Sequence, residues 1–120
     1  MTEITNGKQY DLEERCLNFS KKINSYVNNL PRTISNIENG RQLVRSAGSV
    51  GANYIEANES LSKKDFIMRA KISKKECKET RYWLNLSEPQ DTNIKEKSFL
   101  LQEANELMRI LGAILEKFKK

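Results

Sequence analysis

Apolar side chains recur at spacings of three and four residues in four separate segments of this 120-residue chain. Because an α-helix makes a turn in about 3.6 residues, that spacing collects them on one helix face. The segments span residues 11–30, 33–58, 62–87 and 91–118 and predict four amphipathic helices. The expected core positions are Leu12, Cys16, Phe19, Ile23, Val27 and Leu30; Ile37, Leu43, Ala47, Val50, Gly51 and Tyr54; Phe66, Ala70, Ser73, Cys77, Thr80 and Leu84; and Leu100, Ala104, Leu107, Leu111, Ile114 and Phe118.

Short breaks separate the four segments. Pro31 and Pro89 each end a helix, since the residue before a proline avoids helical geometry. Ser62 followed by Asp65 is a capping pattern that begins the third helix. Short connections leave neighbouring helices antiparallel, so the sequence predicts an all-α, up-down-up-down antiparallel four-helix bundle over residues 11–120. The other candidate caps are Thr33 or Ser35 for the second helix and Asp91 or Thr92 for the fourth.

The composition fits one soluble domain. Charged residues make up 31% of the chain and apolar residues 38%, which suits a helical protein with a thin core. Residues 1–10 are polar and are predicted to form a disordered N-terminal lead. No apolar run approaches the roughly 18 residues of a membrane span, and no signal peptide is visible. We therefore expect a cytoplasmic protein with reduced thiols and no membrane partner.

Small residues cluster in the second predicted helix, at Ala47, Gly48, Gly51 and Ala52. A glycine inside a helix costs about 1 kcal/mol relative to alanine, so two of them need a physical reason. Close approach of another backbone is the preferred explanation, and a bend in the helix is the alternative.

Basic side chains concentrate in residues 62–81, which hold eight of them and three acidic ones. That segment therefore carries +5, which equals the net charge of the whole chain. On a helical wheel most of these lysines share one arc of about 100°. A row of this kind can bind phosphates of nucleic acid, keep the protein soluble, or contact an acidic protein. No aromatic residue interleaves with the lysines, which argues against recognition of bases. The candidate nucleic-acid-binding residues are Lys63, Lys64, Lys71, Lys74, Lys75, Lys78 and Arg81.

Two further surfaces are candidates for contacts between copies of the chain. On the third helix, an aliphatic residue and a tryptophan lie outside the core stripe, which suggests a second buried surface; a wide core is the alternative. On the second helix, small residues within a polar row would let another helix sit close, although plain solvated surface would also tolerate them. The candidate interface residues are Arg69, Ile72, Glu76 and Trp83, together with Arg45, Ser49, Ala52, Asn53 and Glu56.

Catalytic chemistry is poorly supplied. The chain has no histidine, and Cys16 and Cys77 both fall on core stripes, where thiols are usually inert. Glu76 and Glu79 lie one turn apart, but carboxylate metal sites in helical bundles also use histidine. We therefore expect no enzymatic activity, no cofactor and no metal.

Several linked motifs run through the second and third predicted helices, and they comprise Arg45, Ser49, Val50, Ala52, Asn53, Tyr54, Glu56, Ala57, Ser62, Lys63, Asp65, Phe66, Lys75, Glu76, Glu79, Thr80, Tyr82, Trp83 and Leu84. On these residues the chain resembles the small four-helix-bundle proteins encoded in intervening sequences of bacterial large-subunit ribosomal RNA genes. The resemblance covers roughly residues 11–120 and is densest from 45 to 84. Lys74 and Cys77 depart from the family pattern, where an aliphatic residue and an alanine are usual. The resemblance implies a bundle that assembles into a ring, typically a pentamer. A related branch, the accessory proteins of diversity-generating retroelements, binds nucleic acid and a reverse transcriptase.

The leading hypothesis is a non-enzymatic, oligomeric accessory protein that binds DNA or RNA through the lysine-rich side of the third helix. The alternative is a structural scaffold for a protein partner, such as a reverse transcriptase, with no nucleic-acid role. A third interpretation is the product of a mobile insertion with no role in its host.

Overall fold

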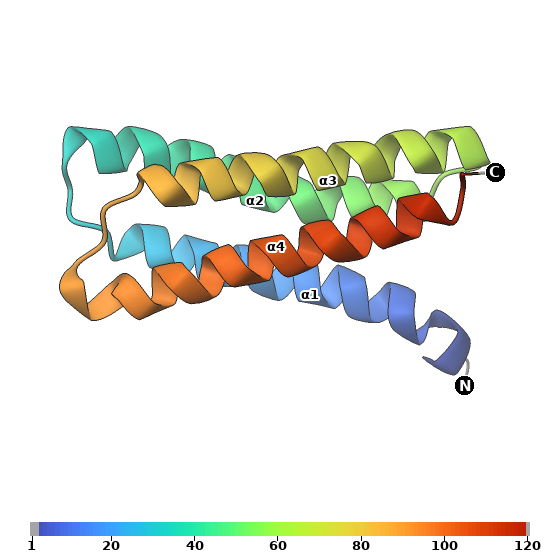
Figure 1. Cartoon of the computed structure of the whole chain (residues 1–120), viewed down its shortest axis with the longest axis horizontal. Coiled ribbons are helices and arrows are strands. Elements are labelled where there is room, and N and C mark those ends of the chain that lie inside the picture. Colours follow the sequence, from blue (N-terminus) through green and yellow to red (C-terminus); the bar gives the residue numbers. More distant parts are fainter. Residues whose placement is uncertain (1–2, 120) are drawn as a thin grey trace.

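Four long helices run alternately up and down in a computed structural model of the chain (Figure 1). The structure describes the backbone of residues 3–119 and the side chains of residues 12–119, and no strand occurs in that range. The predicted all-α, antiparallel four-helix bundle is therefore confirmed. The predicted lead, residues 1–10, lies outside the fully described residues. The elements are α1 (Glu3–Asn28), α2 (Ile34–Asn58), α3 (Lys63–Leu86), the 3₁₀ helix η1 (Asp91–Asn93) and α4 (Ile94–Glu116).

Side chains cap two of the helices as their sequences predict. The Thr33 hydroxyl accepts a hydrogen bond from the backbone N–H of Asn36 at 3.1 Å and begins α2. The Ser62 hydroxyl accepts one from the backbone N–H of Asp65, also at 3.1 Å, and begins α3. Each bond satisfies a donor that the first turn of a helix leaves without a partner.

The start of α4 is different, and the predicted caps Asp91 and Thr92 are wrong. Both residues lie in η1, and α4 begins after Asn93 without a side-chain cap. The N–H of Asn93 instead donates to the carbonyl oxygen of Gln90 at 2.8 Å. The 3₁₀ turn therefore gives the N–H of Asn93 a hydrogen-bond partner without a capping side chain.

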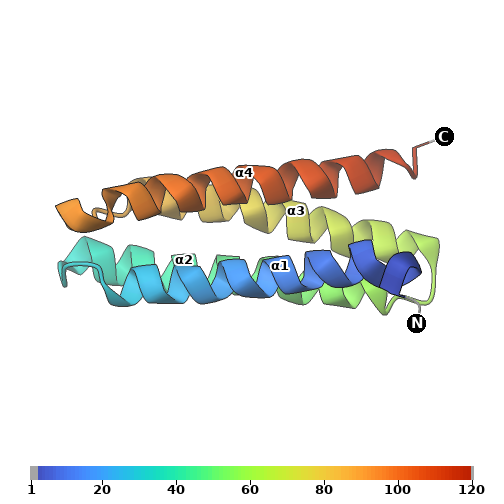
Figure 2. The same ribbon diagram turned by 90° about the horizontal axis from the view of Figure 1, so that it is seen from below.

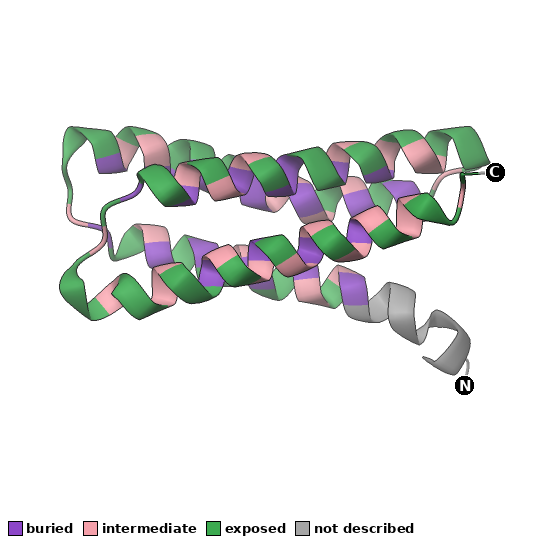
Figure 3. Ribbon diagram, viewed as in Figure 1, coloured by how far each residue is buried: buried purple, intermediate pink, exposed green. Residues whose placement is uncertain are grey.

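The core runs along the centre of the bundle, where the buried positions of all four helices face inward (Figure 3). Eighteen of the 24 predicted stripe positions are buried. Val27 and Ile114 are partly buried and pack against the core, and the other partly buried positions are Ile37, Gly51, Phe66 and Phe118. Tyr26 was not predicted but is 1% exposed, and its hydroxyl lies 2.7 Å from the Ser87 hydroxyl oxygen. That hydrogen bond allows a phenol to be buried.

Polar groups hold α2 and α3 together inside the core. The Ser73 hydroxyl donates to the backbone carbonyl of Val50 at 2.7 Å. The Thr80 hydroxyl oxygen lies 2.9 Å from the Ser46 hydroxyl oxygen and also donates to the carbonyl of Glu76 at 2.7 Å. These small hydroxyls let the two helices approach closely, and among the residues with described side chains every buried side-chain N or O atom has a hydrogen-bond partner.

The contact between α1 and α4 is more polar. In Figure 2, α1 and α2 lie in one layer and α4 lies in the layer above them. The guanidinium of Arg15 donates two hydrogen bonds to the Glu103 carboxylate, at 2.7 and 2.9 Å. The amino group of Lys22 lies 4.9 Å from the ring centre of Phe99. These two contacts connect the outer helices near the surface.

Close packing explains one of the two central glycines of α2. A Cβ on Gly51 would stand only 3.1 Å from the Cβ of Cys16 in α1, so this position confirms the predicted close approach. A Cβ on Gly48 would stand 3.8 Å from the Ser20 hydroxyl, an ordinary contact. Gly48 therefore has no such reason in the isolated chain.

A buried asparagine joins the two connections at one end of the bundle. The side-chain amide of Asn36 donates to the carbonyls of Pro31 and Glu88 at 2.9 and 3.0 Å. Its oxygen accepts the N–H of Glu88 at 3.0 Å. Asn36 thus fixes the α1–α2 connection against the α3–α4 connection, a role that sequence reasoning missed.

Candidate functional site

The lysine face of α3 is the set of seven basic residues that the sequence singled out. Its six lysines are exposed, whereas Arg81 is half-buried, with its guanidinium 3.8 Å from the sulfur of Met108. None of the seven lies within ion-pair distance of a carboxylate among the described residues. The lysine face comprises Lys63, Lys64, Lys71, Lys74, Lys75, Lys78 and Arg81.

The members of this face do not all point the same way. Lys71, Lys75 and Lys78 follow one another at spacings of four and three, so they form a row along the helix, the lysine row. Lys74 leans toward α4, because its amino nitrogen lies 3.5 Å from where a Cβ on Gly112 would stand. Lys63 lies at the start of α3, with its amino nitrogen 5.7 Å from the ring centre of Phe118.

No aromatic residue interleaves with the lysine row, but an exposed aromatic side chain extends it by one turn at its C-terminal end. Tyr82 comes four residues after Lys78, so it lies on the same helix face one turn further on. Its side chain is 59% exposed. Its ring packs edge to face against Trp83, with centroids 4.9 Å apart and planes at 76°. Helical periodicity could have predicted this position from the sequence, because Tyr82 lies one residue beyond the basic segment 62–81.

The two surfaces predicted as oligomer contacts meet each other where α2 packs against α3. The Arg45 guanidinium contacts the Glu79 carboxylate and lies 3.4 Å from an oxygen of Glu76. The indole N–H of Trp83 donates to the same Glu79 carboxylate at 2.9 Å. The hydrogen bonds from Trp83 and Arg45 hold the pKa of Glu79 below its usual range. These bonds give the polar residues partners within the chain.

A second group of the predicted residues lies further along the contact between α2 and α3. The amide of Asn53 donates to the carbonyl and the hydroxyl of Ser49, at 2.9 and 3.0 Å. The guanidinium of Arg69 then donates to the Asn53 side-chain oxygen at 3.1 Å. Ala52 and Glu56 are exposed beside this group. The contact between α2 and α3 therefore carries two groups of hydrogen-bonded side chains, and the exposed residues Ala52 and Glu56 of α2 lie beside the second group.

Reactive chemistry is scarce in the part of the chain with described side chains. Cys16 and Cys77 are buried and free, and burial raises the pKa of each thiol to about 12. At neutral pH both are therefore protonated and poorly nucleophilic. Among the described residues, no three His, Cys, Asp or Glu side chains gather in a way that could hold a metal ion.

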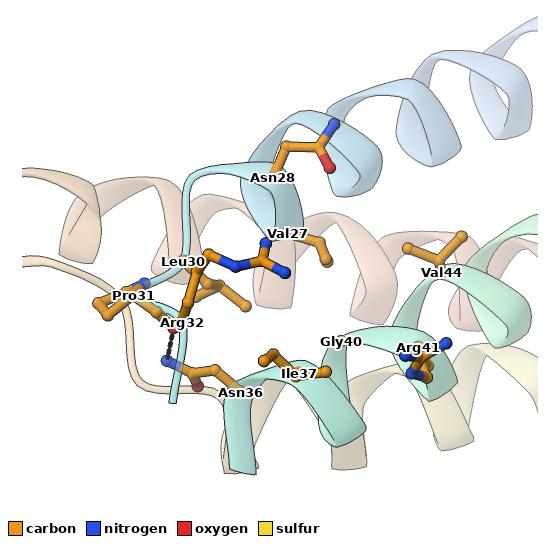
Figure 4. Close-up of a pocket in the computed structure, with 10 residues that line it drawn as sticks. All are labelled: Val27, Asn28, Leu30, Pro31, Arg32, Asn36, Ile37, Gly40, Arg41 and Val44. Atoms are coloured by element: carbon orange, nitrogen blue, oxygen red, sulfur yellow. Dashed lines mark hydrogen bonds between the residues drawn. The ribbon is translucent and has the colours of Figure 1, made fainter. Parts of the chain in front are cut away.

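A cavity of about 440 Å³ lies beside the α1–α2 connection (Figure 4). Val27, Ile37 and Val44 give it an apolar wall, and Arg32 and Arg41 add positive charge. Its ten lining residues include no carboxylate, thiol or hydroxyl, so they offer neither a general base nor a nucleophile.

None of the described helices has the length and apolar character needed to cross a membrane.

The four helices and the basic face of α3 define a small all-α bundle protein. The family model described as 23S rRNA-intervening sequence protein matches residues 8–113, and the chain belongs to that family. No curated protein matches the chain. A similar solved structure is a crystal structure of a protein with unknown function from the S23 ribosomal protein family, from Bacteroides thetaiotaomicron. It is 26% identical, with a TM-score of 0.75 over 91% of this chain and 98% of that one.

Proposed function

We propose that this chain is a non-enzymatic, self-associating accessory protein that binds nucleic acid through the lysine face of α3. The supporting observation is the charge arrangement of that helix. Its six lysines are exposed and have no carboxylate partner among the described residues, whereas Arg15, Arg45 and Arg109 are all paired. The proposed compartment is the bacterial cytoplasm, where such thiols stay reduced.

Exposed ammonium groups that form no ion pair with a carboxylate are available to bind the phosphates of nucleic acid. From Lys64 to Arg81 the helix rises about 25 Å, enough for several phosphates. Each phosphate contact releases counter-ions from the nucleic acid, so affinity should fall steeply as salt rises. Because phosphates are the same at every position, binding should tolerate changes of sequence.

Exposed apolar side chains on α2 support self-association. Val44 and Ile55 lie eleven residues apart, about three turns of α2, and Gly48 and Ala52 fall near the same line. A second helix could pack closely on such a surface. We propose a homo-oligomer of five subunits, the number that the family resemblance implies, with the predicted interface residues of α2 and α3 taking part.

The exposed apolar side chains Val44 and Ile55 of α2 also favour a second candidate function, a scaffold for a protein partner with no role for nucleic acid. In that case the lysine face only keeps the protein soluble. A reverse transcriptase is one partner that the resemblance suggests. Direct measurement of nucleic-acid binding distinguishes the two functions, because the scaffold predicts none.

The test compares the wild-type chain with a variant carrying Lys71→Glu, Lys75→Glu and Lys78→Glu. Binding to labelled DNA and RNA is measured by fluorescence anisotropy across a range of salt concentrations. We expect wild-type binding that weakens with salt, and loss of binding in the variant. Helicity and mass should not change, because all three side chains are exposed.

The matched control reverses three exposed basic residues elsewhere, by Lys21→Glu, Arg32→Glu and Lys95→Glu. It changes the net charge by the same amount but spares the lysine face, so most of the binding should remain. Equal loss in both variants would show that only net charge matters. Wild-type protein that binds neither DNA nor RNA at low salt would refute the nucleic-acid role.

A further inference from the structure

Tyr82 differs from the other residues of its helix face in being both aromatic and exposed. It continues the line of the lysine row by one more turn, so the outward face reads Lys71, Lys75, Lys78, Tyr82 at spacings of four, three and four. One turn rises about 5.4 Å, and therefore the ring and the last ammonium group are neighbours along the helix. An aromatic surface beside a row of positive charges is the arrangement that single-stranded nucleic acid uses.

The ring is held in place by a chain of contacts that begins on α2. Arg45 contacts the Glu79 carboxylate, and Glu79 accepts the indole N–H of Trp83 at 2.9 Å. Trp83 then meets Tyr82 edge to face, at 4.9 Å between ring centres. The Tyr82 side chain nevertheless remains 59% exposed, so the ring stays open to a ligand. A ring positioned in this way loses little conformational freedom when a base stacks on it.

We propose that the lysine row and Tyr82 together bind single-stranded RNA or DNA, with one base stacked on the Tyr82 ring and the adjoining phosphates along Lys78, Lys75 and Lys71. This inference rests on the proposed nucleic-acid function and adds the strand type to it. In a duplex, base faces are covered by their neighbours, so only phosphates can reach this helix. An unpaired strand offers both phosphates and an open base, and it should therefore bind more tightly.

The test uses four labelled ligands of equal length: a single-stranded oligothymidylate, a single-stranded oligouridylate, an abasic strand with the same phosphates, and a DNA duplex. Their affinities for the full chain are measured at one low salt concentration. Because stacking on an aromatic side chain is worth roughly 1–3 kcal/mol per base, we expect the base-bearing strands to bind about ten-fold more tightly than the abasic strand. The two base-bearing strands separate a preference for RNA from one for DNA.

Three variants separate stacking from charge. Tyr82→Phe keeps the ring and should keep the preference, whereas Tyr82→Leu and Tyr82→Ala should lower affinity for the base-bearing strands about ten-fold. Their affinity for the abasic strand and the duplex should not change. Phe99→Ala is the matched control, because Phe99 is 49% exposed and lies beside a lysine on another face. It should leave all four affinities unchanged.

The outcomes distinguish this inference from the function on which it rests. Equal affinity for base-bearing and abasic strands, or a loss in Tyr82→Leu that extends to the abasic strand, would overturn stacking while phosphate binding stands. Tightest binding to the duplex would also overturn it. Wild-type protein that binds none of the four ligands would overturn the nucleic-acid function itself, and the stacking inference with it. Unchanged thermal midpoints in the Tyr82 variants check that folding is intact.

Discussion

Glu79 accepts hydrogen bonds from two side chains, and its charge therefore matters to the contact between α2 and α3. Its carboxylate receives the Arg45 guanidinium and the Trp83 indole N–H, which lower its pKa. A carboxyl whose pKa is lower in the folded state stabilises that state above its unfolded pKa. The stabilisation is lost as pH falls through the folded value.

The first prediction concerns this carboxylate. Glu79→Gln should lower the free energy of unfolding at pH 7 by less than about 1 kcal/mol, since the side chain is one third exposed. The difference in the free energy of unfolding between variant and wild type should become smaller below about pH 4.5, the ordinary pKa of a Glu side chain. Urea unfolding followed by circular dichroism at pH 7 and pH 3 measures both. Glu38→Gln, on an exposed residue, is the control and should show no change. A gap that widens in acid would contradict the assignment.

The second prediction concerns the two thiols. Cys16 and Cys77 are at most 1% exposed, and burial raises the pKa of each to about 12. Since the thiolate is the reactive form, native protein should react with a thiol reagent far more slowly than urea-unfolded protein at pH 7. Mass spectrometry of labelled samples follows the reaction. Rapid labelling of both residues before unfolding would show that the core opens.

At the scale of helices, two glycines of α2 that look alike in the sequence should respond oppositely to substitution. Gly48→Ala should raise the free energy of unfolding by up to about 1 kcal/mol, because alanine favours the helix and finds space. Gly51→Ala should gain nothing or destabilise, because its Cβ would meet the Cβ of Cys16 at 3.1 Å. Chemical denaturation of the two variants gives the comparison. A stabilising Gly51→Ala would mean that α1 moves away easily.

The helices themselves could be predicted from the sequence because their information is local. Apolar spacing, two prolines and the Ser62 cap placed three connections and four helices close to where they lie. Asn36 could not be predicted in its role, since its partner Glu88 is 52 residues away. For the same reason, the contacts of Arg45 with Glu79 and of Asn53 with Arg69 could not be predicted from the sequence.

At the scale of the whole molecule, we expect light scattering to give a mass about five times that of one 13.9 kDa chain. Ala52→Arg should reduce that mass without loss of helicity, because it places a long charged side chain at an exposed position of α2 in the proposed interface. Ala113→Arg, at an exposed position of α4, is the control and should leave the mass unchanged. A monomer at micromolar concentration would refute self-association.

The net positive charge of the molecule is concentrated on α3, so its charge distribution is one-sided. Residues 62–81 carry the entire net charge, so the rest of the surface is neutral overall. Two copies that approach through their α3 helices repel each other, while other approaches meet no net repulsion. Any closed assembly should therefore turn its lysine faces away from its subunit contacts. Each added copy then presents one more outward basic strip, and a long strand held by one strip meets the next at high effective concentration.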